Sequence, residues 1–133
     1  MRKINKIALI SPKRKIWSSN SKIKKVFESR NAYLKAHFSP NLSLITVAGL
    51  IPNDIEIDYI DEDFEEIDFD KKYDFVGVSS MTQQAYRSYQ IASEFKKRGV
   101  FCIIGGIHAS VMPGEALRYF DTVFVGESEL TMQ

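Results

Sequence analysis

The chain has 133 residues and a mass of 15.2 kDa; 44% of its residues are hydrophobic, 26% are charged, and the net charge is +1. These values are typical of one globular domain with its own core, and they exclude a multidomain protein, a disordered chain and a fibrous repeat. No apolar stretch reaches the ~20 residues of a membrane span, no cleavable leader follows Met1, and the single cysteine, Cys102, excludes an internal disulfide, so we expect a cytoplasmic protein.

The first predicted strand covers residues 6–10 and ends at Ser11-Pro12, because proline cannot continue a central strand. Residues 1–38 carry eleven Lys or Arg against a single acid, whereas residues 54–74 carry eleven Asp or Glu against two lysines. We interpret residues 13–38 as a basic insertion or mobile loop. The charge separation leaves open docking on an acidic partner, nucleic-acid binding, or attraction between the two segments within one fold.

A helix is predicted over residues 40–50, with Ser39-Pro40 as its N-cap and first-turn proline and an end at Ile51-Pro52. Apolar residues then alternate with acidic ones over residues 55–59. This period of two is typical of a half-exposed strand near a sheet edge. Residues 63–66 are expected to begin one further short turn.

Three later runs are short and rich in branched or aromatic residues, which is typical of strands buried on both faces of a parallel sheet. These runs are residues 75–79, 100–104 and 122–125. One predicted helix between them runs from a capping box of Ser80 and Gln83 to a cationic last turn before Gly99, and another covers residues 113–120. The alternation predicts an α/β fold with a doubly wound, five-stranded, mostly parallel sheet, a three-layer sandwich of the flavodoxin-like or Rossmann-like kind.

In such a sheet, ligands bind outside the carboxyl ends of the strands. Here those ends carry small, polar or glycine residues, which leave room for a large planar ligand and offer hydroxyls to its polar periphery. Glycine after a strand is also ordinary turn chemistry, so each position has a structural interpretation too. The candidate binding residues are Ser11, Pro12, Ser79, Ser80, Met81, Thr82, Gly105, Gly106, Ile107, His108, Gly126 and Glu127.

Several classes of function lack their motifs. No phosphate-binding glycine loop follows the first strand, which argues against a nucleotide site. The acidic residues of a phospho-accepting domain are absent from the ends of the first and third strands. No nucleophile with a base and an orienting group can be recognised around His37 or His108, so we predict no catalytic residue and no metal ligand in this chain.

An ordered set of motifs runs through most of the chain. It comprises Ser-Pro-Asn-Leu-Ser-Leu at residues 39–44, Asp-Phe-Val-Gly-Val-Ser-Ser at 74–80, Ile-Gly-Gly-Ile-His-Ala at 104–109, Pro-Gly-Glu-Ala-Leu at 113–117, and Gly-Glu-Ser-Glu at 126–129. In order and spacing, this set resembles the amino-terminal cobalamin-binding domain of cobalamin-dependent radical S-adenosylmethionine enzymes. The second half of the chain is the stronger match.

The resemblance implies a groove that holds the corrin ring and nucleotide tail of cobalamin. It places residues 79–82 beside the tail or ring and residues 105–108 in the neighbouring loop, while Gly126 and Glu127 close the far side. Many cobalamin carriers have a cobalt-ligating histidine after the first strand, but this chain has Ser11-Pro12 there. The resemblance therefore implies a cofactor bound without a lower histidine ligand, which favours the reduced cobalt that accepts a methyl group. Loss of the cofactor is the alternative.

The chain has two histidines that are candidates for ligating cobalt. His37 is a conceivable substitute ligand, whereas we interpret His108 as a loop histidine that bonds to backbone. Cys102 lies inside an apolar strand and is interpreted as a buried small hydrophobe.

One cysteine cannot supply the three-cysteine motif of a radical enzyme's iron–sulfur cluster. We therefore expect a single domain, residues 1–133, that forms the N-terminal part of a longer enzyme. The cluster and S-adenosylmethionine would belong to a C-terminal domain. The sequence predicts a cobalamin-binding module for methyl transfer or related radical chemistry. The alternatives are a cofactor-free protein-interaction domain of the same fold and, less favoured because aromatic residues are sparse there, nucleic-acid binding through the basic segment.

Overall fold

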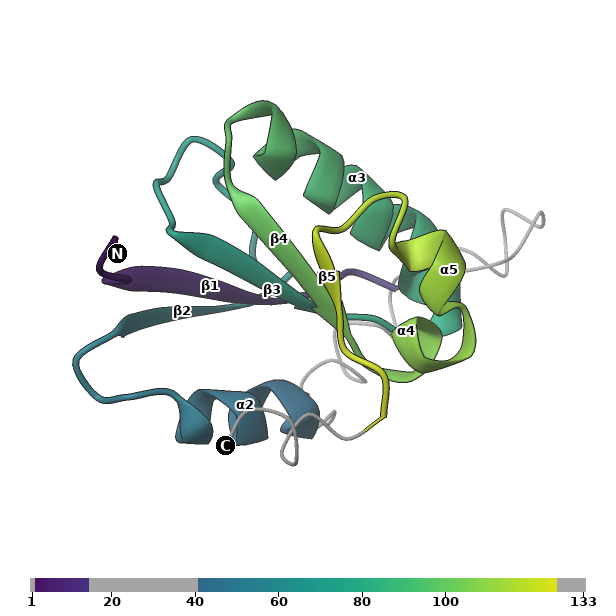
Figure 1. Cartoon of the computed structure of the whole chain (residues 1–133), viewed down its shortest axis with the longest axis horizontal. Helices are drawn as coiled ribbons and strands as arrows, with labels where there is room; N and C mark the ends of the chain where they lie inside the picture. The colour runs from purple at the N-terminus through teal and green to yellow at the C-terminus, as the bar shows by residue number, and fades with distance from the viewer. Residues whose placement is uncertain (1, 15–40, 127–133) are drawn as a thin grey trace.

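The computed structural model describes residues 2–14 and 41–126 of the protein (Figure 1). Most of the predicted basic segment, including His37, therefore lies outside the described residues, and so do Ser39-Pro40 and Glu127. Within the described part, no helix is long and apolar enough to cross a membrane.

Five strands form one sheet in the order β2-β1-β3-β4-β5, and every neighbouring pair is parallel. The strands are β1 (Lys6–Ser11), β2 (Glu56–Asp61), β3 (Phe75–Ser79), β4 (Phe101–Gly105) and β5 (Thr122–Val123). The strand order reverses direction at β1, where the chain moves first to β2 and then back to β3. The predicted doubly wound, parallel sheet is confirmed, and β2 is the edge strand that its alternating sequence indicates.

Helices cover both faces of the sheet, which gives three layers (Figure 1). Helix α2 (Leu42–Leu50) lies on one face, and α3 (Ala85–Lys97) lies on the other after a single 3₁₀ turn, η1 (Thr82–Gln84). The short helices α4 (Ile107–Val111) and α5 (Pro113–Ala116) pack on the α3 side.

The two faces of the sheet are unequally covered. On the α3 side, a large core is built around Phe95 and Phe120, both almost completely buried. On the α2 side, the buried cluster consists only of Ile7, Leu9 and Leu44. Helix α2 therefore covers the half of the sheet next to β1 and leaves the same face of β3, β4 and β5 partly open.

Two helix starts differ from the prediction. Helix α2 begins at Leu42, because Asn41 is its N-cap and accepts a hydrogen bond from the Leu44 N–H at 3.4 Å. The predicted capping box of Ser80 and Gln83 is wrong: the Met81 N–H donates to the Gln84 side chain at 3.0 Å. Ser80 is not the cap: its buried hydroxyl donates to the Met81 carbonyl and lies 2.9 Å from the hydroxyl of Ser88.

The last two predicted elements are shorter than expected. Helix α5 ends at Ala116 and continues only as a turn, because the chain must reach Asp121, whose carboxylate accepts the Cys102 N–H at 2.8 Å. Strand β5 has two residues, and a single further bond, from the Phe124 N–H to the Ile104 carbonyl, extends its pairing.

The acidic stretch finds basic partners within the fold. The Arg14 guanidinium lies 3.3 Å from the carboxylate of Asp63, and the backbone N–H of Lys13 donates to the carboxylate of Glu62 at 3.0 Å. Glu62 is also paired with Arg87 of α3. The first residues of the basic segment are thus attracted to the acidic stretch within one fold, which was one of the three possibilities left by the sequence.

Candidate binding site at the carboxyl ends of the strands

The predicted rim residues come together because hydrogen bonds join their loops. The Ser80 N–H donates to the Gly105 carbonyl at 3.1 Å, and the Ser80 carbonyl accepts the His108 N–H at 3.0 Å. The Gln84 side chain donates to the Pro12 carbonyl at 2.6 Å, which ties the end of β1 to the same place. At the far side, the Gly126 N–H donates to the hydroxyl of Ser110 in α4. The four strand ends therefore share one rim.

Gly106 makes the closest approach at this rim. Its φ of +94° and ψ of −173° are a backbone conformation that essentially only glycine adopts. A Cβ at this position would lie 2.9 Å from the backbone oxygen of Ser80 and 3.0 Å from its nitrogen. The loop after β4 can therefore contact the loop after β3 only because residue 106 has no side chain.

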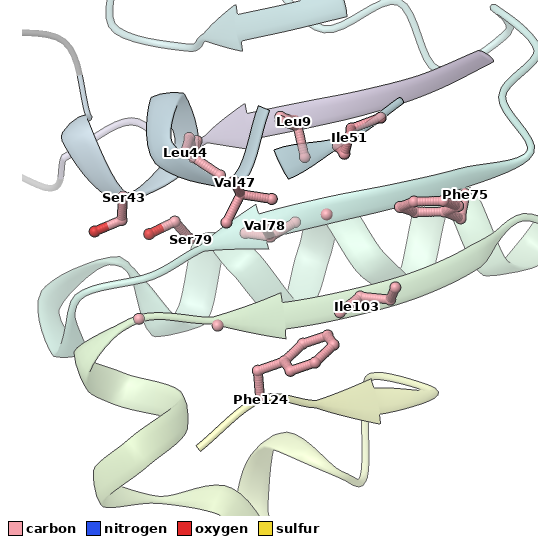
Figure 2. Close-up of a pocket in the computed structure, with 13 residues that line it drawn as sticks. Leu9, Ser43, Leu44, Val47, Ile51, Phe75, Val78, Ser79, Ile103 and Phe124 are labelled. Atoms are coloured by element: carbon pink, nitrogen blue, oxygen red, sulfur yellow. The ribbon is translucent and has the colours of Figure 1, made fainter. Parts of the chain in front are cut away.

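An apolar slot opens beside this rim, between α2 and the open face of the sheet (Figure 2). Its volume is about 110 Å³. The lining residues are Leu9, Ser43, Leu44, Val47, Ile51, Phe75, Gly77, Val78, Ser79, Ile103, Gly105, Gly106 and Phe124. Side chains of a strand alternate between its faces, so Phe75, Gly77 and Ser79 share the slot face of β3. Two glycines of the lining present no side chain to the slot: Gly77 in the middle of β3 and Gly105 at the end of β4.

The slot is apolar apart from two hydroxyls. Among its lining residues, only Ser43 and Ser79 have polar side chains, and Figure 2 shows both at one end, with Phe75 toward the other. Ser79 is the last residue of β3 and lies at the carboxyl end of the sheet. The arrangement suits a flat apolar group that enters from the rim and keeps its polar atoms near the entrance.

The candidate residues predicted from the sequence divide into three groups by position. Those that line the slot are Ser79, Gly105 and Gly106. Those buried in the walls of the rim are Ser11, Pro12, Ser80 and His108. Those with exposed side chains or backbone at the rim are Met81, Thr82, Ile107 and Gly126, with Met81 45% and Ile107 59% exposed.

His108 does not lie in a loop, and that interpretation is wrong. It belongs to α4, and its imidazole is buried on the α3 side of the sheet, away from the slot. Its Nε2 lies 2.6 Å from the hydroxyl of Tyr89 and 3.7 Å from a carboxylate oxygen of Glu115. Burial, followed by the charge of Glu115, raises the pKa of Tyr89 to about 12, so the phenol keeps its proton.

We expect Tyr89→Phe to lower the free energy of unfolding by about 1–2 kcal/mol, because it leaves a buried imidazole without its partner. In the described part of the chain, Nδ1 of His108 already has none. Urea denaturation followed by circular dichroism measures the change. Tyr86→Phe on the same helix is the matched control, since Tyr86 is 69% exposed. Equal stabilities of the two variants would contradict the role of the Tyr89 hydroxyl.

The sequence analysis did not predict most of the residues that line the slot. The residues not predicted are Leu9, Ser43, Leu44, Val47, Ile51, Phe75, Gly77, Val78, Ile103 and Phe124. One signal was available: Gly77 interrupts a buried strand, where glycine often marks the close approach of another group.

Among the described residues of the rim, no cysteine or histidine side chain is placed to react with a bound group or to ligate a metal. Cys102 is fully buried in β4, as predicted, and burial raises the pKa of its thiol to about 12. Among the described residues, no three His, Cys, Asp or Glu side chains are grouped so that they could hold a metal ion.

Comparison with known proteins gives two kinds of match. The B12 binding domain family model matches residues 36–133. The chain is 40% identical over 90 residues to bacteriochlorophyllide d C-8(2)-methyltransferase of Chlorobaculum tepidum, a match over 67% of this chain and 20% of that protein. It is 34% identical over 91 residues to bacteriochlorophyllide d C-12(1)-methyltransferase of the same organism, a match over 66% of this chain and 20% of that protein. The chain thus spans about a fifth of the length of these relatives, and no solved structure matches it significantly.

Proposed function

The chain belongs to the B12-binding domain family, and on this premise we propose that it holds cobalamin as the cofactor-carrying module of a methyltransferase. The family match confirms the resemblance to cobalamin-binding domains. The observation that carries the proposal is the apolar slot, which opens at the rim beside Gly105, a residue with no side chain to obstruct the entrance.

The slot and the rim fit the two parts of the cofactor. An apolar cleft under α2 suits the base of the nucleotide tail, and the hydroxyls of Ser43 and Ser79 suit heteroatoms near its entrance. Outside the slot, Met81 and Ile107 expose apolar side chains on which a broad macrocycle can pack. We propose that residues 79–82 and 105–108 form the two loops that support the tail and ring, with Gly126 and Glu127 at the far side. His108 would contribute through its backbone N–H, which bonds to the Ser80 carbonyl and joins the two loops.

We also propose that no side chain of the described rim ligates cobalt from below. The described histidine, His108, is directed toward Tyr89, and Cys102 lies inside β4. When bound, cobalamin supplies a cobalt centre that accepts a methyl group and passes it on. The described residues would contribute by seating the tail, and neither His108 nor Cys102 would be placed to ligate the metal. We propose the same of His37, which lies outside the described residues, so His37→Ala is expected to leave the spectrum of bound cobalamin unchanged.

The methyl acceptor and the radical chemistry are proposed to belong to another domain. The two relatives are named for methylation at different positions, yet they match this chain to similar extents. This is expected if the module carries the cofactor and does not choose the position. We propose that an iron–sulfur cluster and S-adenosylmethionine are held by a C-terminal domain of the whole enzyme.

The proposal is tested by titrating the purified chain with hydroxocobalamin. We expect about one equivalent to be retained after gel filtration, because the domain offers one slot at one rim. The visible spectrum of the retained corrin is expected to be that of cobalamin whose own base has been displaced. A folded chain that retains no corrin would rule out the proposed function.

A further inference from the structure

The two ends of the slot differ in chemistry. Ser43 and Ser79 place their hydroxyls at the end next to the rim, whereas Phe75 and Ile103 lie toward the other end (Figure 2). No other side chain in the lining carries a polar atom. A group entering from the rim therefore passes two hydroxyls and then meets an apolar inner end.

The backbone beneath the slot is already hydrogen-bonded. Leu9 pairs with Gly77, and Gly77 pairs with Ile103, in the parallel ladder of β1, β3 and β4. The N–H and C=O groups of such strands bond to their neighbours and point along the sheet. Within the described residues, the inner end of the slot therefore offers neither side-chain nor backbone partners to a polar group.

Resting on the proposed function, we infer that this slot selects cobamides by the base of their nucleotide tail. It accepts an apolar benzimidazole base and discriminates against a purine base of the same size. The six-membered ring of dimethylbenzimidazole carries only carbon and methyl groups. The corresponding ring of adenine carries two nitrogens and an amino group, and these lose their hydrogen bonds to water when they are buried beside Phe75 and Ile103.

Water cannot easily compensate for those lost bonds. The slot has a volume of about 110 Å³ and is walled by leucine, isoleucine and phenylalanine. Apolar cavities of this kind stay dry and accept flat aromatic rings, because a water molecule needs several polar partners. One or two unpaired groups then weaken binding of the adenine cobamide by roughly 10-fold to 100-fold.

The experiment compares three corrinoids on the full chain by visible absorbance titration. They are cobalamin, the cobamide whose base is adenine, and cobinamide, which has no nucleotide tail. We expect cobalamin to bind with the lowest Kd, the adenine cobamide about 10-fold to 100-fold more weakly, and cobinamide also more weakly than cobalamin.

A pair of variants ties the preference to the slot. Ile103→Gln places an amide at the inner end, where it can donate to and accept from a purine, so the ratio of the two Kd values is expected to fall several-fold. Phe101→Gln is the control, because residue 101 lies on the same face of β4 but is 48% exposed and outside the lining. That variant is expected to keep the parent ratio.

Each contrary result has a distinct meaning. Equal Kd values for cobalamin and the adenine cobamide would overturn the selectivity and leave the proposed function standing. Cobinamide that binds as tightly as cobalamin would overturn it too, because the tail would then not enter the slot. An unchanged ratio in Ile103→Gln would show that the slot does not read the base. Failure of all three corrinoids to bind would remove the proposed function and the selectivity together.

Discussion

Gly106→Ala is expected to lower the free energy of unfolding by about 3 kcal/mol or more, the largest stability effect of any single methyl addition at the described rim. Two costs combine. The φ of +94° with a ψ of −173° is unfavourable for alanine. The added Cβ also meets the backbone oxygen of Ser80 at 2.9 Å. That backbone cannot withdraw without breaking its hydrogen bonds to Gly105 and His108.

Alanine substitutions at two other glycines separate the conformational cost from the steric cost. Gly99 has a φ of +75° and open space within 4 Å of the place that an alanine methyl would take, so Gly99→Ala carries the conformational cost alone, about 1 kcal/mol. Gly114 has open space and no positive φ, so Gly114→Ala should be neutral or slightly stabilising. Urea denaturation of the three variants gives the order. A Gly106→Ala variant no less stable than Gly99→Ala would show that the two rim loops can separate without cost.

The strands could be predicted from sequence because they are set by short-range pattern. Residues 75–79 form a branched apolar run, and residues 55–59 alternate strictly with acids; each became the expected strand within one or two residues. Helix α3 was equally recognisable, because its buried residues Tyr89, Ala92 and Phe95 recur at helical spacing and Gly99 ends it.

Helix α4 could not be predicted in the same way. Five residues, Ile107–Val111, are too few to show a period of 3.6, and glycine is its N-cap. The helix decides where His108 points, and its imidazole is therefore held by Tyr89 in the core on the far side of the sheet. His108, which the sequence motif places at the rim, is therefore a residue of the packed core in the fold.

The slot depends on tertiary placement, which no local pattern encodes. Val47 and Ile51 reach it only because α2 lies over β1 and leaves the faces of β3 and β4 partly open. Phe124 reaches it from the opposite edge, beyond the last residue of β5. The entrance of the slot, at Ser79 and Gly105, could be predicted from the sequence because strand ends can be predicted. The residues of the slot walls could not, because they depend on where helix α2 lies relative to the sheet.

Gly105→Leu is expected to raise the Kd for hydroxocobalamin at least about 100-fold while leaving the fold intact. Residue 105 is the last residue of β4 and lines the slot. A Cβ there would lie 3.9 Å from the Cβ of Phe124, an ordinary contact, and the backbone has no positive φ. The leucine side chain therefore enters the slot without strain. An aromatic base kept out of the slot loses burial of about 150 Å², or about 4 kcal/mol at about 25 cal/mol per Å², which exceeds a 100-fold change in Kd.

The free energy of unfolding of Gly105→Leu shows whether the substitution fills the slot or damages the fold. Leucine at residue 105 covers the partly exposed walls at Ile103 and Phe124, so the free energy of unfolding should be unchanged or slightly higher. Gly49→Leu is the matched control, since residue 49 lies on the exposed side of α2 with no atom within 4 Å of its Cβ position, and it should bind hydroxocobalamin as the parent does. If Gly105→Leu is stable and still binds with the parent Kd, the tail of the cofactor does not occupy the slot, and the seat of cobalamin must be sought elsewhere on the rim.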